Sequence, residues 1–369
     1  MPSMRLSPLK PNSTEWSRMC RGGYVAQLLA GAWRGSPFNG AAEELDEIAS
    51  LVATNGAGAL AWCRVRNSDL RTSSTGQLFQ AQYRFQSLQA ALHERSLKKV
   101  IPLLRATGVE PLLVKGWAIA RLYPEASMRP YIDLDLCVLP DDYARASEVL
   151  SSAECDDCNV DLHVGFGKFY DQRTHEIFAR SRLVKLDDLE VRVLGTEDDL
   201  RFLCMHLLRH GAALPLWLCD VAVLMEDLPG DFDWDRCLSG SRKKADWVAC
   251  AIGLAHQLLG VEVEGTPVAD RARNLPAWLV STVLEAWGAP FRSRGQLAVY
   301  LREPGRLLRQ LPKELPRHWP NPIEATVSLK GPFNSLPRLP FQLGHVASRS
   351  AALISQLVGE LGGAVLHRG

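Results

Sequence analysis

Two aspartates, Asp133 and Asp135, form an Asp-x-Asp pair within residues 132–138. Apolar and acidic residues alternate there, which predicts a β-strand with both carboxylates on one face. Neighbouring carboxylates repel each other, and a divalent cation such as Mg²⁺, shared with substrate phosphates, is the simplest way to keep both ionised. A solvated strand edge with two surface acids is the commoner explanation when such a pair stands alone.

Lys115 and Gly116 lie where a predicted strand meets a predicted helix. The apolar residues 112–114 predict a short buried strand, and residues 117–122 predict a helix. Backbone N–H groups at the start of a helix favour an anion, and a glycine lets a phosphate approach the backbone closely. We therefore expect a phosphate to bind at Lys115 and Gly116.

Two more charged residues favour a phosphate and metal site over a solvated edge. Arg129 is an isolated charge shortly before the acidic pair. Asp161 lies in residues 159–164, which also alternate like a strand. A third acid on a neighbouring strand would add an oxygen ligand for a metal ion.

The order of these motifs resembles a family of uncharacterised bacterial nucleotidyltransferase-like proteins, within the polymerase-β-like nucleotidyltransferase superfamily. The resemblance covers about residues 45–260. It is carried by Val114-Lys115-Gly116, Tyr123-Pro124, Met128-Arg129-Pro130, Asp133-Leu134-Asp135 and Val160-Asp161-Leu162-His163. In one respect the chain departs from the family: only SSAECDDC separates Leu150 from Asn159, where we expect a longer insertion with another strand.

The resemblance implies roles for the polar residues of this region. Those expected to bind the metal and to serve catalysis are Asp133, Asp135 and Asp161, and those expected to bind phosphates are Lys115, Gly116 and Arg129. Candidates for contacts with the substrate are His163, His206, His210 and Asp220. For His206 and His210, which are four residues apart and so share a helix face, hydrogen-bonded histidines inside a helical bundle are the commoner explanation.

The reaction implied by the resemblance is nucleotidyl transfer that depends on Mg²⁺ or Mn²⁺. An NMP, expected to be AMP, would move from an NTP, expected to be ATP, to a hydroxyl group of a small molecule or of a peptide or protein side chain. Two alternatives stay open. One is a non-catalytic nucleotide-binding or regulatory module on the same fold, and the other is a phosphoryl transferase.

Composition and charge predict an ordinary globular protein. The 369 residues are 47% hydrophobic, which is enough for a sizeable core. The net charge of +1 argues against nucleic acid as a partner. No apolar run approaches the roughly 18 residues that suggest a membrane span, and the first residues lack the apolar core of a signal peptide. We therefore expect a cytoplasmic protein.

The predicted fold class is α+β. We expect an N-terminal helical layer over residues 1–107, a small mixed-sheet nucleotidyltransferase core over residues 108–195, and a helical, proline-rich substrate domain over residues 196–369. Within the first part, residues 77–107 predict one long helix, or two helices broken near Pro102. Its apolar residues Phe79, Phe85, Leu88 and Leu92 are expected on one side, packed into the core.

Overall fold

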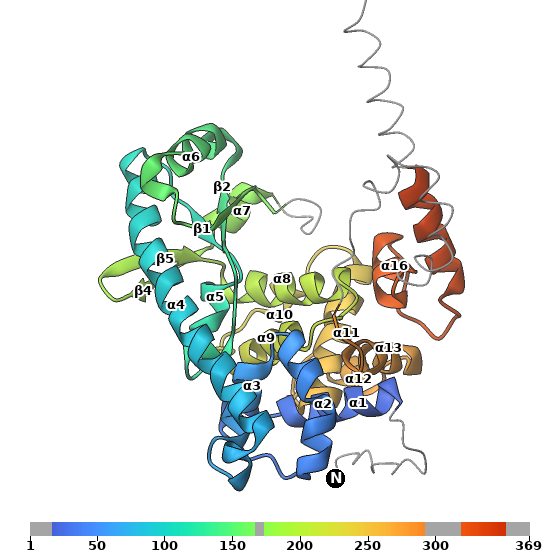
Figure 1. The fold of residues 1–369 in the computed structure, drawn as a ribbon. Coiled ribbons are helices and arrows are strands. Elements are labelled where there is room, and N and C mark those ends of the chain that lie inside the picture. The colour runs from blue at the N-terminus through green and yellow to red at the C-terminus, as the bar shows by residue number, and fades with distance from the viewer. Residues whose placement is uncertain (1–16, 167–172, 292–318, 352–369) are drawn as a thin grey trace, which may run out of the picture.

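Strands occupy the middle of the chain, with helices before and after them, as Figure 1 shows. The computed structural model describes residues 17–166, 173–291 and 319–351. The first helices are α1 (Arg18–Leu29), α2 (Ala42–Thr54), α3 (Gly58–Val65) and α4 (Ser74–Ala106). The middle contains β1 (Leu112–Leu113), α5 (Trp117–Ala120), β2 (Leu134–Val138), α6 (Tyr143–Leu150), β3 (Val160–Val164), α7 (Thr174–Ala179), β4 (Arg182–Leu186) and β5 (Leu189–Val193). Then follow α8 (Thr196–Arg209), α9 (Pro215–Glu226), α10 (Trp234–Cys237), α11 (Arg242–Leu259), α12 (Ala269–Arg273), α13 (Ala277–Trp287) and α16 (Pro322–Ser328). Over the described ranges, no helix combines the length and the apolar character needed to cross a membrane.

The five strands form one mixed sheet in the order β3-β2-β1-β5-β4. The pairs β2–β3 and β1–β5 are parallel, whereas β1–β2 and β4–β5 are antiparallel. This sheet, with helices on both sides of it in the sequence, confirms the predicted α+β class. The expected strand around Asp161 is also confirmed: β3 pairs directly with β2 and forms an edge of the sheet.

The two faces of the sheet differ in character. On one face, Leu134, Leu136 and Val138 pack in an apolar cluster with residues from α4 and α6. Because side chains alternate along a strand, Asp135 and Cys137 point to the opposite face. The apolar cluster there is smaller and includes Cys137 and Phe202 of α8. The acidic residue Asp135 therefore lies on the face with the smaller apolar cluster.

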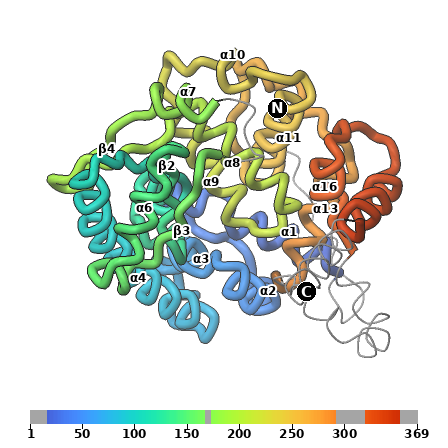
Figure 2. Tube along the Cα trace, turned by 90° about the horizontal axis from the view of Figure 1, so that it is seen from above, coloured from blue at the N-terminus to red at the C-terminus, as the bar shows by residue number. Residues whose placement is uncertain are grey.

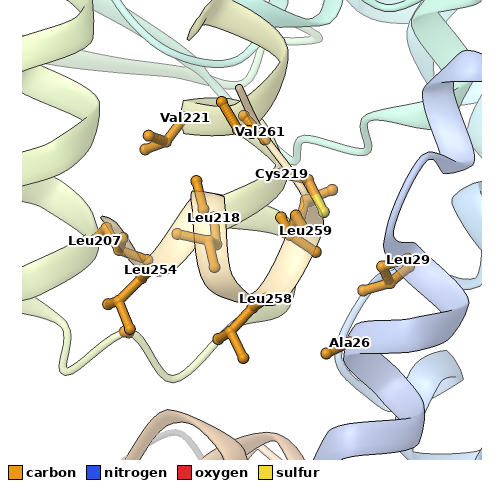
Figure 3. Packing of buried hydrophobic residues seen from close by; sticks show 14 of the residues in the cluster. Ala26, Leu29, Leu207, Leu218, Cys219, Val221, Leu254, Leu258, Leu259 and Val261 are labelled. Atoms are coloured by element: carbon orange, nitrogen blue, oxygen red, sulfur yellow. The ribbon is translucent and has the colours of Figure 1, made fainter. Parts of the chain in front are cut away.

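One large core joins the first helices to helices that follow the sheet. Apolar residues of α1, α2 and α3 share a cluster with residues of α8, α9, α11 and α13. Figure 3 shows Leu207, Leu218 and Leu254, from α8, α9 and α11, beside one another, with Leu29 of α1 near the same core. The domain boundaries near residues 107 and 195 stay a prediction, since the outer parts share this core.

The long helix α4 runs without a break, and Pro102 lies inside it. The prediction that its apolar residues share one buried side is wrong. Phe79 is fully buried, but Phe85 and Leu88 are 57% and 59% exposed, and Leu92 is 45% exposed. A helix turns roughly 100° per residue, so six residues place Phe85 about 240° away from Phe79. Figures 1 and 2 show α4 at the periphery of the molecule.

Helices α1 and α13 cross at unusually short distance, and Gly22 permits it. A Cβ atom built on Gly22 would lie 1.9 Å from the backbone oxygen of Leu284 in α13. The adjacent Gly23 has no atom within 4 Å of the same position. The two glycines thus share one helix and differ in their surroundings.

We expect Gly22→Ala to lower the free energy of unfolding by about 1–3 kcal/mol, because the added methyl group forces the two backbones apart. The matched control Gly23→Ala should raise it by up to about 1 kcal/mol, since alanine has the higher helix propensity. Urea unfolding followed by circular dichroism measures both changes. Equal effects of the two substitutions would contradict this packing.

Candidate active site

Asp135 and Asp161 lie side by side on the open face of the sheet. They are direct register partners on the parallel strands β2 and β3. His163, two residues further along β3, points to the same face, and its Nε2 lies 3.2 Å from Oδ1 of Asp135 and 3.2 Å from Oδ2 of Asp161. One ligand atom from each of the three residues falls within 4.8 Å of the others. Asp135 is buried, whereas the side chain of Asp161 is 54% exposed.

Lys115 reaches the same group from the turn after β1. Its Nζ lies 2.6 Å from Oδ1 of Asp135. Lys115 and Gly116 both have positive φ, 57° and 49°, a conformation that costs a non-glycine residue on the order of 1 kcal/mol or more. The N–H of Val114 donates to the carbonyl of Asp135 at 3.0 Å, which ties the turn to β2. The strained backbone of Lys115 therefore belongs to the residue whose side chain contacts Asp135.

The charges of this group perturb one another. Burial alone would raise the pKa of Asp135, but the hydrogen bond from His163 and the Lys115 ammonium outweigh it and lower that pKa. The hydrogen bond to Asp135 in turn raises the pKa of His163. Burial, followed by the Asp135 charge, raises the pKa of Asp133. Cationic groups thus stabilise ionised Asp135, while Asp133 lacks comparable compensation.

The donor set suits a divalent cation. Two carboxylates and one imidazole offer mainly hard oxygen ligands, as Mg²⁺ and Mn²⁺ prefer, and a nitrogen that Mn²⁺ accepts. Asp133 lies just before β2 and outside the group of Asp135, Asp161 and His163. Its place among the ligands stays a prediction.

Arg129 is held in a buried ion pair with Asp220 of α9. Its Nη2 lies 2.7 Å from Oδ2 of Asp220, and the side chains are 7% and 1% exposed. The hydroxyl of Tyr123 donates to Oδ1 of the same carboxylate at 2.9 Å. Burial alone would lower the pKa of Arg129, but Asp220 overrides this and raises it. In this structure Asp220 supports Arg129, and the contact of Arg129 with phosphate stays a prediction.

The two predicted histidines of α8 contact each other and an aromatic neighbour. The ring centroids of His206 and His210 are 4.6 Å apart, and Trp217 of α9 lies 4.8 Å from His206 and 5.1 Å from His210. Burial, followed by the charges of His210, Lys115 and Arg129, lowers the pKa of His206 well below its ordinary value. His206 is therefore neutral near pH 7 and lies within the electrostatic reach of Lys115.

Three supporting residues were not predicted from the sequence. His93 of α4 stacks on Tyr131 with 4.7 Å between ring centroids, and its Nε2 lies 3.1 Å from the Tyr131 carbonyl, which steadies the segment before Asp133. The other two are Tyr123, which donates a hydrogen bond to Asp220, and Trp217, whose ring lies against the rings of His206 and His210. Tyr123 belongs to a quoted motif, but nothing in the spacing of His93 or Trp217 points to these contacts.

Comparison with known proteins finds one matching family. The sequence profile of a family described as "Uncharacterised nucleotidyltransferase" matches residues 41–156 and 155–260, more than half of the chain. The chain belongs to this family. The matched region contains every predicted site residue, and membership supports a role in nucleotidyl transfer. No curated protein and no solved structure matches significantly.

We expect Arg129→Met to lower the free energy of unfolding by about 3–5 kcal/mol, because it leaves the Asp220 carboxylate buried without its partner. The double variant Arg129→Met/Asp220→Leu should recover most of this loss, since both charges are then gone. Urea unfolding of the single and double variants measures the coupling. Arg145→Met, which breaks the pair between the exposed Arg145 and the half-buried Asp142, is the control and should cost less than about 1 kcal/mol.

Proposed function

We propose that the chain is a metal-dependent nucleotidyltransferase that moves AMP from ATP to a hydroxyl group of a small molecule or of a peptide or protein side chain. The observation that carries this proposal is the register pairing of Asp135 with Asp161, beside Lys115, on one sheet face. Family membership supports the reaction class. The identities of the metal, the nucleotide and the acceptor belong to the proposal.

Asp135, Asp161 and His163 would hold the divalent cation, with Asp133 as a further ligand. These groups carry up to three negative charges, and Lys115 supplies one positive charge against them. A cation would therefore be bound where negative charge is in excess. When bound, the divalent cation neutralises the triphosphate and lowers the pKa of the attacking hydroxyl.

Lys115 is suited to holding the leaving pyrophosphate. Its ammonium, which contacts Asp135, would also bind a phosphate oxygen, and a fixed cation stabilises charge that builds up on the leaving group. Gly116 lets that phosphate approach the backbone. Arg129, in the position that the ion pair with Asp220 maintains, would be a second cation for the phosphates.

Asp161 is suited to the acceptor side, because it is the exposed carboxylate of the pair and lies on an edge strand. It would take the proton of the acceptor hydroxyl while that oxygen bonds to the α-phosphorus. The bond from the α-phosphorus to the bridging oxygen breaks, and pyrophosphate leaves. The neutral imidazole of His206, with His210 and Trp217, would contact the nucleotide or the acceptor from the α8 side.

We expect Asp161→Asn to keep Mg·ATP binding but to lose transfer by about 10²-fold or more, because a proton acceptor acts mainly in the transition state. The double variant Asp133→Asn/Asp135→Asn should lose transfer as well, through loss of the metal. Asp156→Asn, an exposed acid shortly before β3, is the matched control and should transfer normally. Transfer is measured with α-labelled and γ-labelled ATP and a fractionated lysate as the source of acceptors.

The position of the label separates the competing functions. Nucleotidyl transfer retains the α-label on the acceptor and releases pyrophosphate. Retention of the γ-label would instead indicate phosphoryl transfer, and ATP binding without either label on an acceptor would indicate a regulatory module. Transfer by Asp161→Asn within a few-fold of the wild type would contradict the role given to Asp161.

A further inference from the structure

The exposed face of α4 carries an apolar stripe with regular spacing. Leu78, Phe85 and Leu92 are seven residues apart, and Leu88 lies between the last two. These four side chains are 40–59% exposed. With a rise of 1.5 Å per residue, the stripe is about 21 Å long, which matches four turns of a second helix. The spacing is that of a seam along which two helices pack.

All but one of the charged residues of α4 are basic. The single acid of α4 is Glu94, and its Oε1 accepts a hydrogen bond from Trp117 on the inner side. Lys98 forms an ion pair with Asp187, and Lys99 forms one with Asp157. Among the described residues, Arg84 and Arg95 are exposed and have no ion-pair partner.

A hollow of about 470 Å³ continues the stripe at the start of α4. It is lined by Arg71, Thr72, Gln77, Gln80, Ala81 and Arg84. Two guanidinium groups and two amides in such a hollow suit a carboxylate side chain, which arginine binds well. The hollow lies outside the active site, so neither feature is explained by nucleotidyl transfer.

We propose that α4 docks an amphipathic helix of another protein, with apolar residues at three- and four-residue spacing and acidic residues on its flanks. The apolar residues would pack on Phe85 and Leu88 and their neighbours along the stripe, and the acids would face Arg71, Arg84 and Arg95. A second copy that packs through its own α4 fits less well, because it would bring the same arginines toward Arg84 and Arg95. This surface goes beyond the proposed function and does not depend on it.

The test uses the full chain and two designed 21-residue helical peptides with leucine at the a and d positions. One has glutamate at the e and g positions, and the matched peptide has lysine there. We expect fluorescence anisotropy to show at least tenfold tighter binding of the acidic peptide, weakened by salt. Phe85→Ser/Leu88→Ser should weaken it tenfold or more, and Arg84→Glu/Arg95→Glu should reverse the preference between the peptides.

Leu183→Ser, which changes an equally exposed apolar residue on β4, is the control and should bind like the wild type. Because all substituted side chains are exposed, circular dichroism should show unchanged folding. Absence of binding, equal binding of both peptides, or an unreversed preference in Arg84→Glu/Arg95→Glu would overturn the proposal. So would light scattering that shows a dimer of the chain lost in Phe85→Ser/Leu88→Ser, because the occupant would then be a second copy.

Discussion

Repulsion between two neighbouring carboxylates is the constraint on which the site depends. Parallel pairing of β2 and β3 places Asp135 directly beside Asp161, and nearby positive charge or hydrogen-bond donors offset the repulsion between them. In this structure the Lys115 ammonium and a hydrogen bond from His163 stabilise the Asp135 carboxylate. Asp135, Asp161 and His163 offer ligand atoms that could hold a divalent cation, and the strained turn at Lys115 and Gly116 holds the lysine against Asp135.

Contacts with helices α8 and α9 join the site on the sheet to the helical part of the protein. The buried pair between Arg129 and Asp220 joins the segment leading to β2 with α9, and Tyr123 fills the remaining hydrogen-bonding capacity of the carboxylate. Phe202 of helix α8 packs in the apolar cluster on the sheet face that carries Asp135, and its ring stacks on that of His206. Because α8 and α9 also belong to the core that contains α1, α2 and α3, the Arg129–Asp220 pair ties the segment before β2 to this core.

Elements that depend on a local sequence pattern could be predicted from the sequence. Alternation around Asp135 and Asp161 predicted the two strands, and the Lys115–Gly116 turn was expected between β1 and α5. Contacts made across long distances in the chain left no such pattern, so neither the Arg129–Asp220 pair nor the stacking of His93 could be foreseen. The error on α4 had another cause: an apolar stripe predicts a buried face only if something covers it, and Phe85 and Leu88 face outward.

The central claim is that Asp135 and Asp161 are both metal ligands, Asp135 for the triphosphate and Asp161 on the acceptor side. A crystal structure grown with Mn²⁺ and an ATP analogue that cannot be cleaved at the α-phosphate tests it most directly. The account predicts an anomalous peak about 2.0–2.2 Å from a carboxylate oxygen of each aspartate, with the α-phosphate against it and Lys115 on the outer phosphates. A nucleotide bound elsewhere, or a peak that one of the two aspartates does not reach, would contradict it.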